Sequence, residues 1–264
     1  MAGRHPFRSI LITGASSGLG RALALELAAP GVRMVLGGRD GMRLAETARA
    51  AVAAGAHVHS RELDVTDSLP MANWVQSEDT IQAFDLVIAN AGVSGETGAP
   101  GERAGQSEWI YRVNVLGILN TVEPLLPAMR GRGRGQIGLV SSIAGFRGSP
   151  HGVAYAGSKS AVIAQGQGWR EALAASGIGV TVICPGYIRT AMTDRHAFRM
   201  PFLMEPDVAA RRIIAALIAN KGLVVLPWPL PIVAWLFRAL PAVVTAPLMQ
   251  RRAPTGASGH DGKP

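Results

Sequence analysis

Short apolar runs alternate with longer amphipathic segments along most of the 264-residue chain. The short runs have strand length and lie at residues 10–13, 33–37, 57–63, 86–89, 136–141, 179–183 and 223–226. Helical patterns lie between them, at residues 19–29, 42–53, 69–78, 107–129, 154–175 and 206–220. Several runs are continuous in Val, Ile and Leu, as in strands whose sheet is covered on both faces. The alternation predicts an α/β fold, a doubly wound parallel seven-stranded sheet with helices on both faces.

The chain has no linker-like stretch before its C-terminal tail, so one large domain is favoured over two small ones. We expect residues 1–222 to form this domain and residues 223–252 to form an apolar extension packed on it or at an interface. The tail, residues 253–264, is rich in Gly, Pro, Ser and His, which predicts disorder.

A glycine-rich turn follows the first predicted strand and opens the first predicted helix. Glycines let the backbone approach a pyrophosphate, and a helix N-terminus offers free N–H groups and a positive dipole end. An ordinary glycine-rich turn is the alternative, but the position between strand and helix favours phosphate binding. The candidate residues are Gly14, Ser16, Ser17, Gly18, Leu19 and Gly20.

The loops after the second and third predicted strands add charged candidates at the same edge of the sheet. Arg39 could meet the 2′-phosphate of NADP, whereas the adjacent Asp40 could hold the ribose of NAD or cap the next helix. We favour NADP, with NAD as the alternative. Asp64 could accept a hydrogen bond from an adenine amino group or serve only its own turn, and Val65 beside it completes this part of the candidate site.

The loops after the fourth and sixth strands add small residues and backbone groups. The first could let a ribose lie against the sheet, and the second could hold the edge of a carboxamide ring. The candidates are Asn90, Ala91, Gly92, Pro185, Gly186, Ile188 and Thr190.

Four polar side chains are candidates for the chemistry. Tyr155 and Lys159 stand four residues apart, so on a helix they share a face, and the ammonium would lower the pKa of the phenol. Such a phenol can give and take a proton near neutral pH. Ser142 precedes this helix. Asn114 lies in an apolar helical run and is either a structural pin or part of a proton path.

In combination, these motifs resemble those of the short-chain dehydrogenase/reductase family. The glycine-rich turn, Asn-Ala-Gly, the helix asparagine, the serine, Tyr-x-x-x-Lys and Pro-Gly-x-x-x-Thr follow the family order from residue 9 to about residue 190. Ala89 departs from the family, which commonly has a second asparagine there, and we expect little loss of function. The resemblance implies a Rossmann fold, a nicotinamide cofactor and a homodimer or homotetramer, with the helices at residues 107–129 and 154–175 as interface elements.

The resemblance also implies roles for the four polar residues. Hydride would pass between a nicotinamide and a carbonyl or alcohol carbon. Tyr155 would protonate or deprotonate the oxygen, and Ser142 would hydrogen-bond it. Lys159 would hold the nicotinamide ribose and lower the Tyr155 pKa, with both residues contacting the cofactor. Asn114 would position a water that links Lys159 to solvent.

Two variable stretches, residues 94–106 and 187–204, would face the substrate in such a protein. The second is rich in Met and Phe, including Met192 and Phe198, and either lines a pocket for an apolar substrate or packs onto the sheet. His151 could touch substrate or lie on the surface.

The apolar extension is about long enough to cross a bilayer, but three prolines in its first half argue against a continuous helix. A residual helix at residues 232–240 is too short to span. Residues 223–252 either dock on a partner subunit or the substrate loop, or lie at a membrane interface with aromatics buried and arginines near headgroups.

Composition and charge bear on the partners, the metal sites and the location of the protein. The net charge of +8 reflects dispersed arginines without a basic and aromatic platform, so we expect no nucleic-acid partner. Cys184 is the only cysteine, which excludes an intrachain disulfide and a cysteine-based zinc site, and we predict no metal. The first residues lack the apolar core of a signal peptide, so we expect the cytoplasm, with possible contact at the inner face of the membrane.

The sequence therefore predicts an NADP(H)-dependent oxidoreductase acting on a small carbonyl or alcohol compound of apolar character. A catalytically silent, cofactor-binding regulatory or scaffold protein of the same fold is the alternative. The presence of all four polar candidates argues against it. Epimerisation is a third possibility, but such enzymes usually carry a larger substrate domain.

Overall fold

The computed structural model describes residues 5–94, 105–148, 152–190, 193, 200 and 202–241. The expectations for the tail at residues 253–264 and for His151, Met192 and Phe198 fall outside these ranges, as does most of the stretch at residues 94–106.

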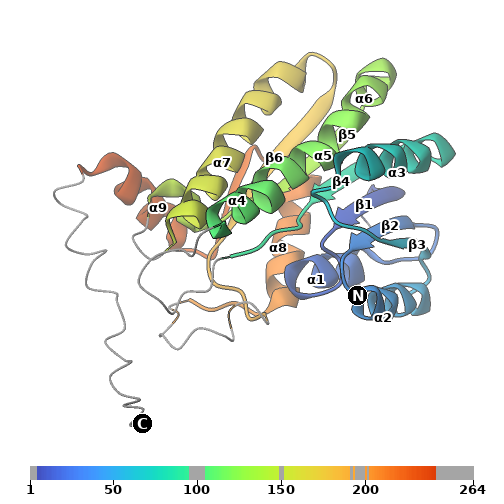
Figure 1. Cartoon of the computed structure of the whole chain (residues 1–264), viewed down its shortest axis with the longest axis horizontal. Helices are drawn as coiled ribbons and strands as arrows, with labels where there is room; N and C mark the ends of the chain where they lie inside the picture. The colour runs from blue at the N-terminus through green and yellow to red at the C-terminus, as the bar shows by residue number, and fades with distance from the viewer. Residues whose placement is uncertain are drawn as a thin grey trace, which may run out of the picture.

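Seven parallel strands form one sheet in the order β3-β2-β1-β4-β5-β6-β7 (Figure 1). This arrangement confirms the predicted α/β class and the seven-stranded parallel sheet. The strand order reverses between β1 and β4, where ligands bind in open α/β sheets. The strands are β1 Ser9–Thr13, β2 Arg33–Gly38, β3 His57–Glu62, β4 Leu86–Ala89, β5 Gly135–Val140, β6 Ile178–Pro185 and β7 Leu223–Leu226.

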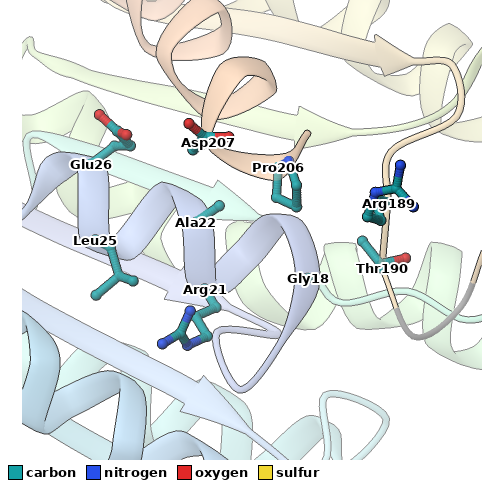
Figure 2. Close-up of a pocket in the computed structure, with 9 residues that line it drawn as sticks. All are labelled: Gly18, Arg21, Ala22, Leu25, Glu26, Arg189, Thr190, Pro206 and Asp207. Carbon is teal, nitrogen blue, oxygen red and sulfur yellow. The ribbon is translucent and has the colours of Figure 1, made fainter. Parts of the chain in front are cut away.

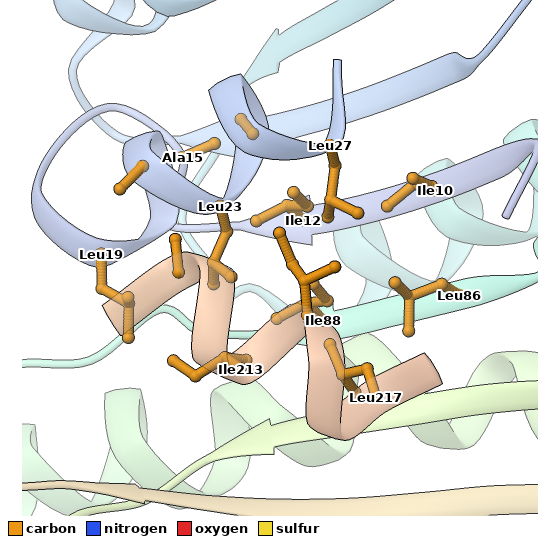
Figure 3. Packing of buried hydrophobic residues seen from close by; sticks show 14 of the residues in the cluster. Ile10, Ile12, Ala15, Leu19, Leu23, Leu27, Leu86, Ile88, Ile213 and Leu217 are labelled. Carbon is orange, nitrogen blue, oxygen red and sulfur yellow. The ribbon is translucent and has the colours of Figure 1, made fainter. Parts of the chain in front are cut away.

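Helices cover both faces of the sheet, because successive strand residues point to opposite sides. Ile10 and Ile12 of β1 pack with α1, α2 and α8, whereas Leu11 between them packs with α3, α5 and α7. Figure 3 shows Leu23 of α1 and Ile213 of α8 within the first of these layers. The helices are α1 Gly18–Leu27, α2 Gly41–Ala53, α3 Ser68–Ile81, α4 Gln106–Tyr111, α5 Gly117–Val122, α6 Leu126–Arg132, α7 Val153–Ala174, α8 Pro206–Ile218 and α9 Leu230–Ala239.

The single helix expected at residues 107–129 is instead divided into three. A π-helical segment, η1 (Arg112–Leu116), separates α4 from α5, and a 3-10 turn, η2 (Glu123–Leu125), separates α5 from α6. Proline in η2 and at the start of α6 explains the second break, since proline lacks the N–H that continues a helix. The π-helical segment has no such breaker in its sequence. It holds Asn114, in agreement with the tendency of π-bulges to occur at functional sites.

The C-terminal extension starts with β7 at the edge of the sheet and continues into α9. The helix begins at Leu230, two residues before the expected start, with proline at its second position, where an N–H is not needed. It contacts β7 and the short 3-10 turn η3 (Ile143–Phe146). Among the described residues, no helix combines the length and apolar character required to cross a bilayer.

Two buried acids, Glu78 and Asp79, lie near the C-terminal end of α3. They are close to the amino-terminal ends of the strands, whereas the predicted site is at the carboxyl ends. Asp79 accepts two hydrogen bonds from Arg132, at 2.7 and 3.0 Å, and one from the backbone N–H of Phe84 at 2.8 Å. The neighbouring Glu78 pairs with Arg33. A buried carboxylate without such partners is strongly destabilising.

We therefore predict that Arg132→Leu lowers the free energy of unfolding by about 3 kcal/mol, since it leaves the Asp79 carboxylate buried and unpaired. Urea denaturation at fixed protein concentration measures the change. The matched control is Arg134→Leu, at an exposed position two residues away, for which we expect a change below about 0.5 kcal/mol. Equal stability of the two variants would contradict a stabilising role for the Arg132–Asp79 pair.

Candidate active site

The turn after β1 packs closely against the end of β4. Gly14 adopts a positive φ of 68°, and a Cβ there would lie 2.8 Å from the Cα of Ala91. The Asn90 side-chain amide donates to the carbonyl oxygens of Thr13 at 3.0 Å and Gly14 at 3.2 Å. A Cβ on Gly20 would collide with the Gly14 carbonyl. These contacts explain why glycines are needed here, and they give Asn90 a structural role.

The residues of this turn fit a pyrophosphate. Ser17 makes no side-chain cap at the N-terminus of α1, so the first N–H groups of the helix are available to an anion. Gly18 has a φ of 53°, and a Cβ there would lie 3.1 Å from Thr190 Cγ2. The loop after β6 thus contacts the loop after β1. The sequence predicted that residues of both loops bind one cofactor, which requires such proximity.

A cavity of about 400 Å³ borders this contact, between α1 and the start of α8 (Figure 2). Arg21 and Arg189 line it, but so do the acids Glu26 and Asp207. The mixed charge suits a phosphate poorly. The N-terminus of α1, where Ser17 makes no side-chain cap, remains the candidate for the pyrophosphate site.

The charged residues after β2 and β3 divide into two pairs. Asp40 caps α2 by accepting the N–H of Arg43 at 3.0 Å and binds its Nε at 2.6 Å, and these hydrogen bonds lower the Asp40 pKa. The capping role expected for Asp40 is confirmed. Arg39 is half exposed, with Nη1 3.7 Å from an Asp64 carboxylate oxygen. Asp64 also accepts the N–H of Thr66 at 2.9 Å, which confirms its turn role.

Asn114 is fully buried and joins three segments. Its oxygen accepts the N–H of Val93 at 2.8 Å, and its nitrogen donates to the Val93 carbonyl at 2.9 Å and to Ser158 Oγ at 3.0 Å. Ser158 in turn donates to the Tyr155 carbonyl at 2.8 Å. The π-helical segment is thereby fixed both to the end of β4 and to α7. The structural-pin interpretation of Asn114 is confirmed, and its place in a proton path stays a prediction.

Ser142, Tyr155 and Lys159 come together where β5 and β6 end. The buried Ser142 hydroxyl caps η3 by accepting the N–H of Ala144 at 3.2 Å, and it lies 3.5 Å from the Pro185 carbonyl. The Ser142 side chain also forms a hydrogen bond with the Tyr155 phenol. Lys159 is buried, with Nζ 3.0 Å from the Val140 carbonyl and 5.8 Å from the centre of the Tyr155 ring.

The pKa expected for the phenol was wrong for this arrangement. Burial is the largest cause and raises the pKa of Tyr155 above its usual value, although the Ser142 hydrogen bond opposes the rise. Lys159 does not lower it, since its ammonium is directed to the Val140 carbonyl and burial lowers the pKa of Lys159 itself to about 8. Loss of solvation thus disfavours the charged form of both groups.

Several supporting residues were not predicted from the sequence. Ser141 donates to the Lys159 carbonyl at 2.7 Å, and a Cβ on Gly145 would lie 2.7 Å from the same oxygen. Thr13 Oγ1 accepts the backbone N–H groups of Asn90 and Ala91. The adjacency of Ser141 to Ser142 was a possible signal, but nothing local shows the role of Gly145.

Three of the remaining cofactor candidates pack against other parts of the fold. Val65 is buried against Gly117, and Gly186 donates its N–H to the Leu226 carbonyl at 2.7 Å. Ile188 is buried and bridges to Met204, which packs into the core. For Met204, the packing interpretation of the stretch 187–204 is therefore confirmed.

Comparison with known proteins decides the family. The model of the short chain dehydrogenase family matches residues 8–199. An uncharacterised oxidoreductase of Myxococcus xanthus is 39% identical over 239 residues, which cover 89% of this chain and 93% of the relative. The chain belongs to the short-chain dehydrogenase/reductase family. Proteins of this family are oxidoreductases that act on CH–OH and C=O groups, and this chain is such an enzyme.

Solved structures of the family agree with this fold. A protein of Beutenbergia cavernae with bound NADP has a TM-score of 0.74 at 27% identity, covering 83% of this chain and 94% of its own. A short chain dehydrogenase of Mycobacterium paratuberculosis bound to NAD has a TM-score of 0.73 at 25% identity, covering 83% of this chain and 95% of its own. Binding of a nicotinamide dinucleotide is therefore a property of the fold that this chain shares.

The lowered pKa of Lys159 predicts a pH-dependent stability. In the unfolded chain Lys159 has a pKa near 10.5, but in the folded protein it loses its proton near pH 8. As the pH rises between these values, the unfolded state binds more protons, so the free energy of unfolding increases. We expect Lys159 to contribute a rise of about 2 kcal/mol from about pH 7.5 to about pH 9.5, measured by urea denaturation. The Cys184 thiol acts in the opposite direction within this window, because burial raises its pKa from 9.0 to about 12, and it reduces the net rise by about 1 kcal/mol. Above this window, ionisation of Tyr155 in the unfolded state also opposes the rise.

Lys159→Met should abolish this rise, and Lys221→Met, at an exposed position, should retain it. A rise of equal size in Lys159→Met would show that the pH dependence comes from other groups.

Proposed function

We propose that this short-chain dehydrogenase uses NADP(H) to interconvert a carbonyl compound and a secondary alcohol, with an apolar substrate. The observation that carries the proposal is the convergence of Ser142, Tyr155 and Lys159 beside a turn shaped for a pyrophosphate. The bound dinucleotide supplies the hydride. The protein supplies the binding site, the orientation and the proton.

Tyr155 is the proposed acid and base. Its raised pKa keeps the phenol protonated at neutral pH, which suits donation of a proton to a carbonyl oxygen during reduction. Ser142 donates a hydrogen bond to the same oxygen and stabilises the charge that develops there. In the oxidation direction, Tyr155 accepts the proton of the alcohol.

Lys159 and Asn114 support the phenol from within the protein. Asn114 Oδ1 and Lys159 Nζ both lie close to Gly92. Each atom lies 3.3 Å from the position that a Cβ on Gly92 would occupy. We infer that a water between the two residues would connect the ammonium to solvent. Lys159 would also hold the nicotinamide ribose, and with a pKa of about 8 it is charged at neutral pH.

The proposed cofactor site follows the carboxyl edge of the sheet from β2 to β6. NADP is favoured over NAD because Arg39 is half exposed and has only a long contact with Asp64, while Asp40 is occupied by the α2 cap. The dinucleotide would lie against Gly14, Ser16, Ser17, Gly18, Leu19, Gly20, Arg39, Asp64, Val65, Asn90, Ala91, Gly92, Tyr155, Lys159, Pro185, Gly186, Ile188 and Thr190.

Assembly as a homodimer or homotetramer is part of the proposal. The helices expected at the interface expose large apolar side chains, with Trp109, Tyr111 and Leu116 on α4 and η1 and Val153 at the start of α7. Burial of these side chains against a second copy would stabilise the assembly. A catalytically silent regulatory protein is not favoured, because it would not need the buried Asn114 and Lys159 in this arrangement.

The first test replaces the proposed acid. Tyr155→Phe removes only the hydroxyl, so turnover with NADPH on a panel of ketones, aldehydes and quinones should fall at least about 100-fold while NADPH affinity is retained. Tyr111→Phe is the matched control, since its hydroxyl lies against Gly157 of α7, two residues from Tyr155 and from Lys159 and therefore on another side of the helix, and it should retain turnover. Substantial activity in Tyr155→Phe would refute the assignment.

The second test concerns the cofactor. Arg39→Ala should weaken NADPH binding about tenfold or more and leave NADH binding unchanged, because only NADPH carries the 2′-phosphate. Fluorescence titration measures both affinities. Arg43→Ala is the control, with a side chain as exposed as that of Arg39 but paired with Asp40. An unchanged NADPH affinity in Arg39→Ala, or tighter binding of NADH by the wild-type protein, would contradict the NADP preference.

A further inference from the structure

The turn before α9 and one side of that helix present large apolar side chains to solvent. Trp228 is 70% exposed and Trp235 is 67% exposed, and Ile232, Leu236 and Leu240 are between 37% and 47% exposed. Positions 232, 235, 236 and 240 have helical spacing, so their side chains form one continuous stripe. Isolated exposed apolar residues are ordinary, whereas a contiguous set such as this one marks an interaction surface. We call these five residues the α9 face.

The first residue of α9 is anchored to the catalytic domain. Leu230 is buried, and its Cδ1 occupies the space that a side chain on Gly186 would need. Its N–H donates to the Pro227 carbonyl at 2.8 Å, which closes the turn that carries Trp228. In Figure 1, α9 lies at the periphery of the molecule, beyond the end of α7. The α9 face is therefore held outward by the fold, not turned inward toward the core.

Two cations line a groove beside this surface. A groove of about 1070 Å³ lies between α8, β7 and α9, and its lining includes Arg212, Lys221 and Trp235 among mostly apolar residues. The sequence from residue 208 to residue 264 holds seven of the 26 Lys and Arg of the chain but only one of the 18 Asp and Glu. The excess positive charge of the protein is thus concentrated in the part of the chain that contains the α9 face.

We propose that the α9 face lies in the headgroup region of an anionic lipid bilayer, with α9 parallel to the membrane plane. Tryptophan and aliphatic side chains would enter the boundary between headgroups and acyl chains, and the surrounding cations would bind the lipid headgroups. The ten residues of α9 span about 15 Å, half of the apolar thickness of a bilayer, so the helix lies on the membrane and does not cross it.

A second copy of the chain is the competing occupant of the α9 face. In a twofold contact the same surface meets itself, so Arg212 and Lys221 beside the α9 face would approach the same residues of the partner. Repulsion of this kind weakens such a contact, whereas an anionic lipid surface attracts the same cations. Charge complementarity therefore favours the bilayer.

The experiment is flotation of the purified full-length protein with vesicles of phosphatidylcholine alone or mixed with phosphatidylglycerol. The double variant Ile232→Ser/Trp235→Ser removes two members of the α9 face. The matched control is Leu69→Ser/Ile81→Ser, whose native side chains on α3 are 69% and 70% exposed. Circular dichroism and NADPH titration verify that each variant is folded, and light scattering gives its oligomeric state.

We expect the wild-type protein and the α3 variant to float with the anionic vesicles, less with phosphatidylcholine alone and less at high salt. The α9 variant should partition at least about tenfold more weakly, with an unchanged oligomeric state. Absence of wild-type flotation, or equal flotation of the two variants, would overturn the proposal. A smaller assembly in the α9 variant without a change in flotation would assign the face to a second copy instead.

Discussion

A side-chain amide joins the ends of the two central strands, and the candidate active site depends on that junction. Asn90, at the end of β4, donates to the backbone carbonyls of Thr13 and Gly14 at the end of β1. The amide can approach because neither Gly14 nor Gly20 carries a Cβ. This contact fixes the turn that leads into α1 at the point where the strand order reverses, which is where ligands bind in open α/β sheets.

Burial, more than ion pairing, sets the chemistry of the proposed catalytic residues. Lys159 and Tyr155 both lose solvation, which moves their pKa values apart, because burial lowers the pKa of the lysine and raises the pKa of the tyrosine. Asn114 and Ser158 fix the helix that carries both residues by satisfying buried hydrogen-bonding groups. Side chains held in this way require little reorganisation when a substrate arrives.

Local patterns were sufficient for most of the fold. The seven predicted strands all formed. Most are Val, Ile and Leu runs buried in the sheet, whereas the edge strand β3 is polar and mostly exposed. The capping role of Asp40 followed from its position before a helix. The division of the helix expected at residues 107–129 was harder to predict from the sequence. Prolines explain one break, but the π-helical segment has no breaker and forms where Asn114 bonds to Val93 and Ser158.

The sequence by itself determined the class of fold, the family resemblance and the four polar residues proposed for catalysis, since these depend on periodicity and spacing along the chain. Only the tertiary structure decided the pKa directions of Tyr155 and Lys159 and the supporting role of Gly145. It also decided which side of α9 is exposed. Desolvation, close backbone approach and surface exposure depend on neighbours that are distant in sequence, so a local pattern does not contain them.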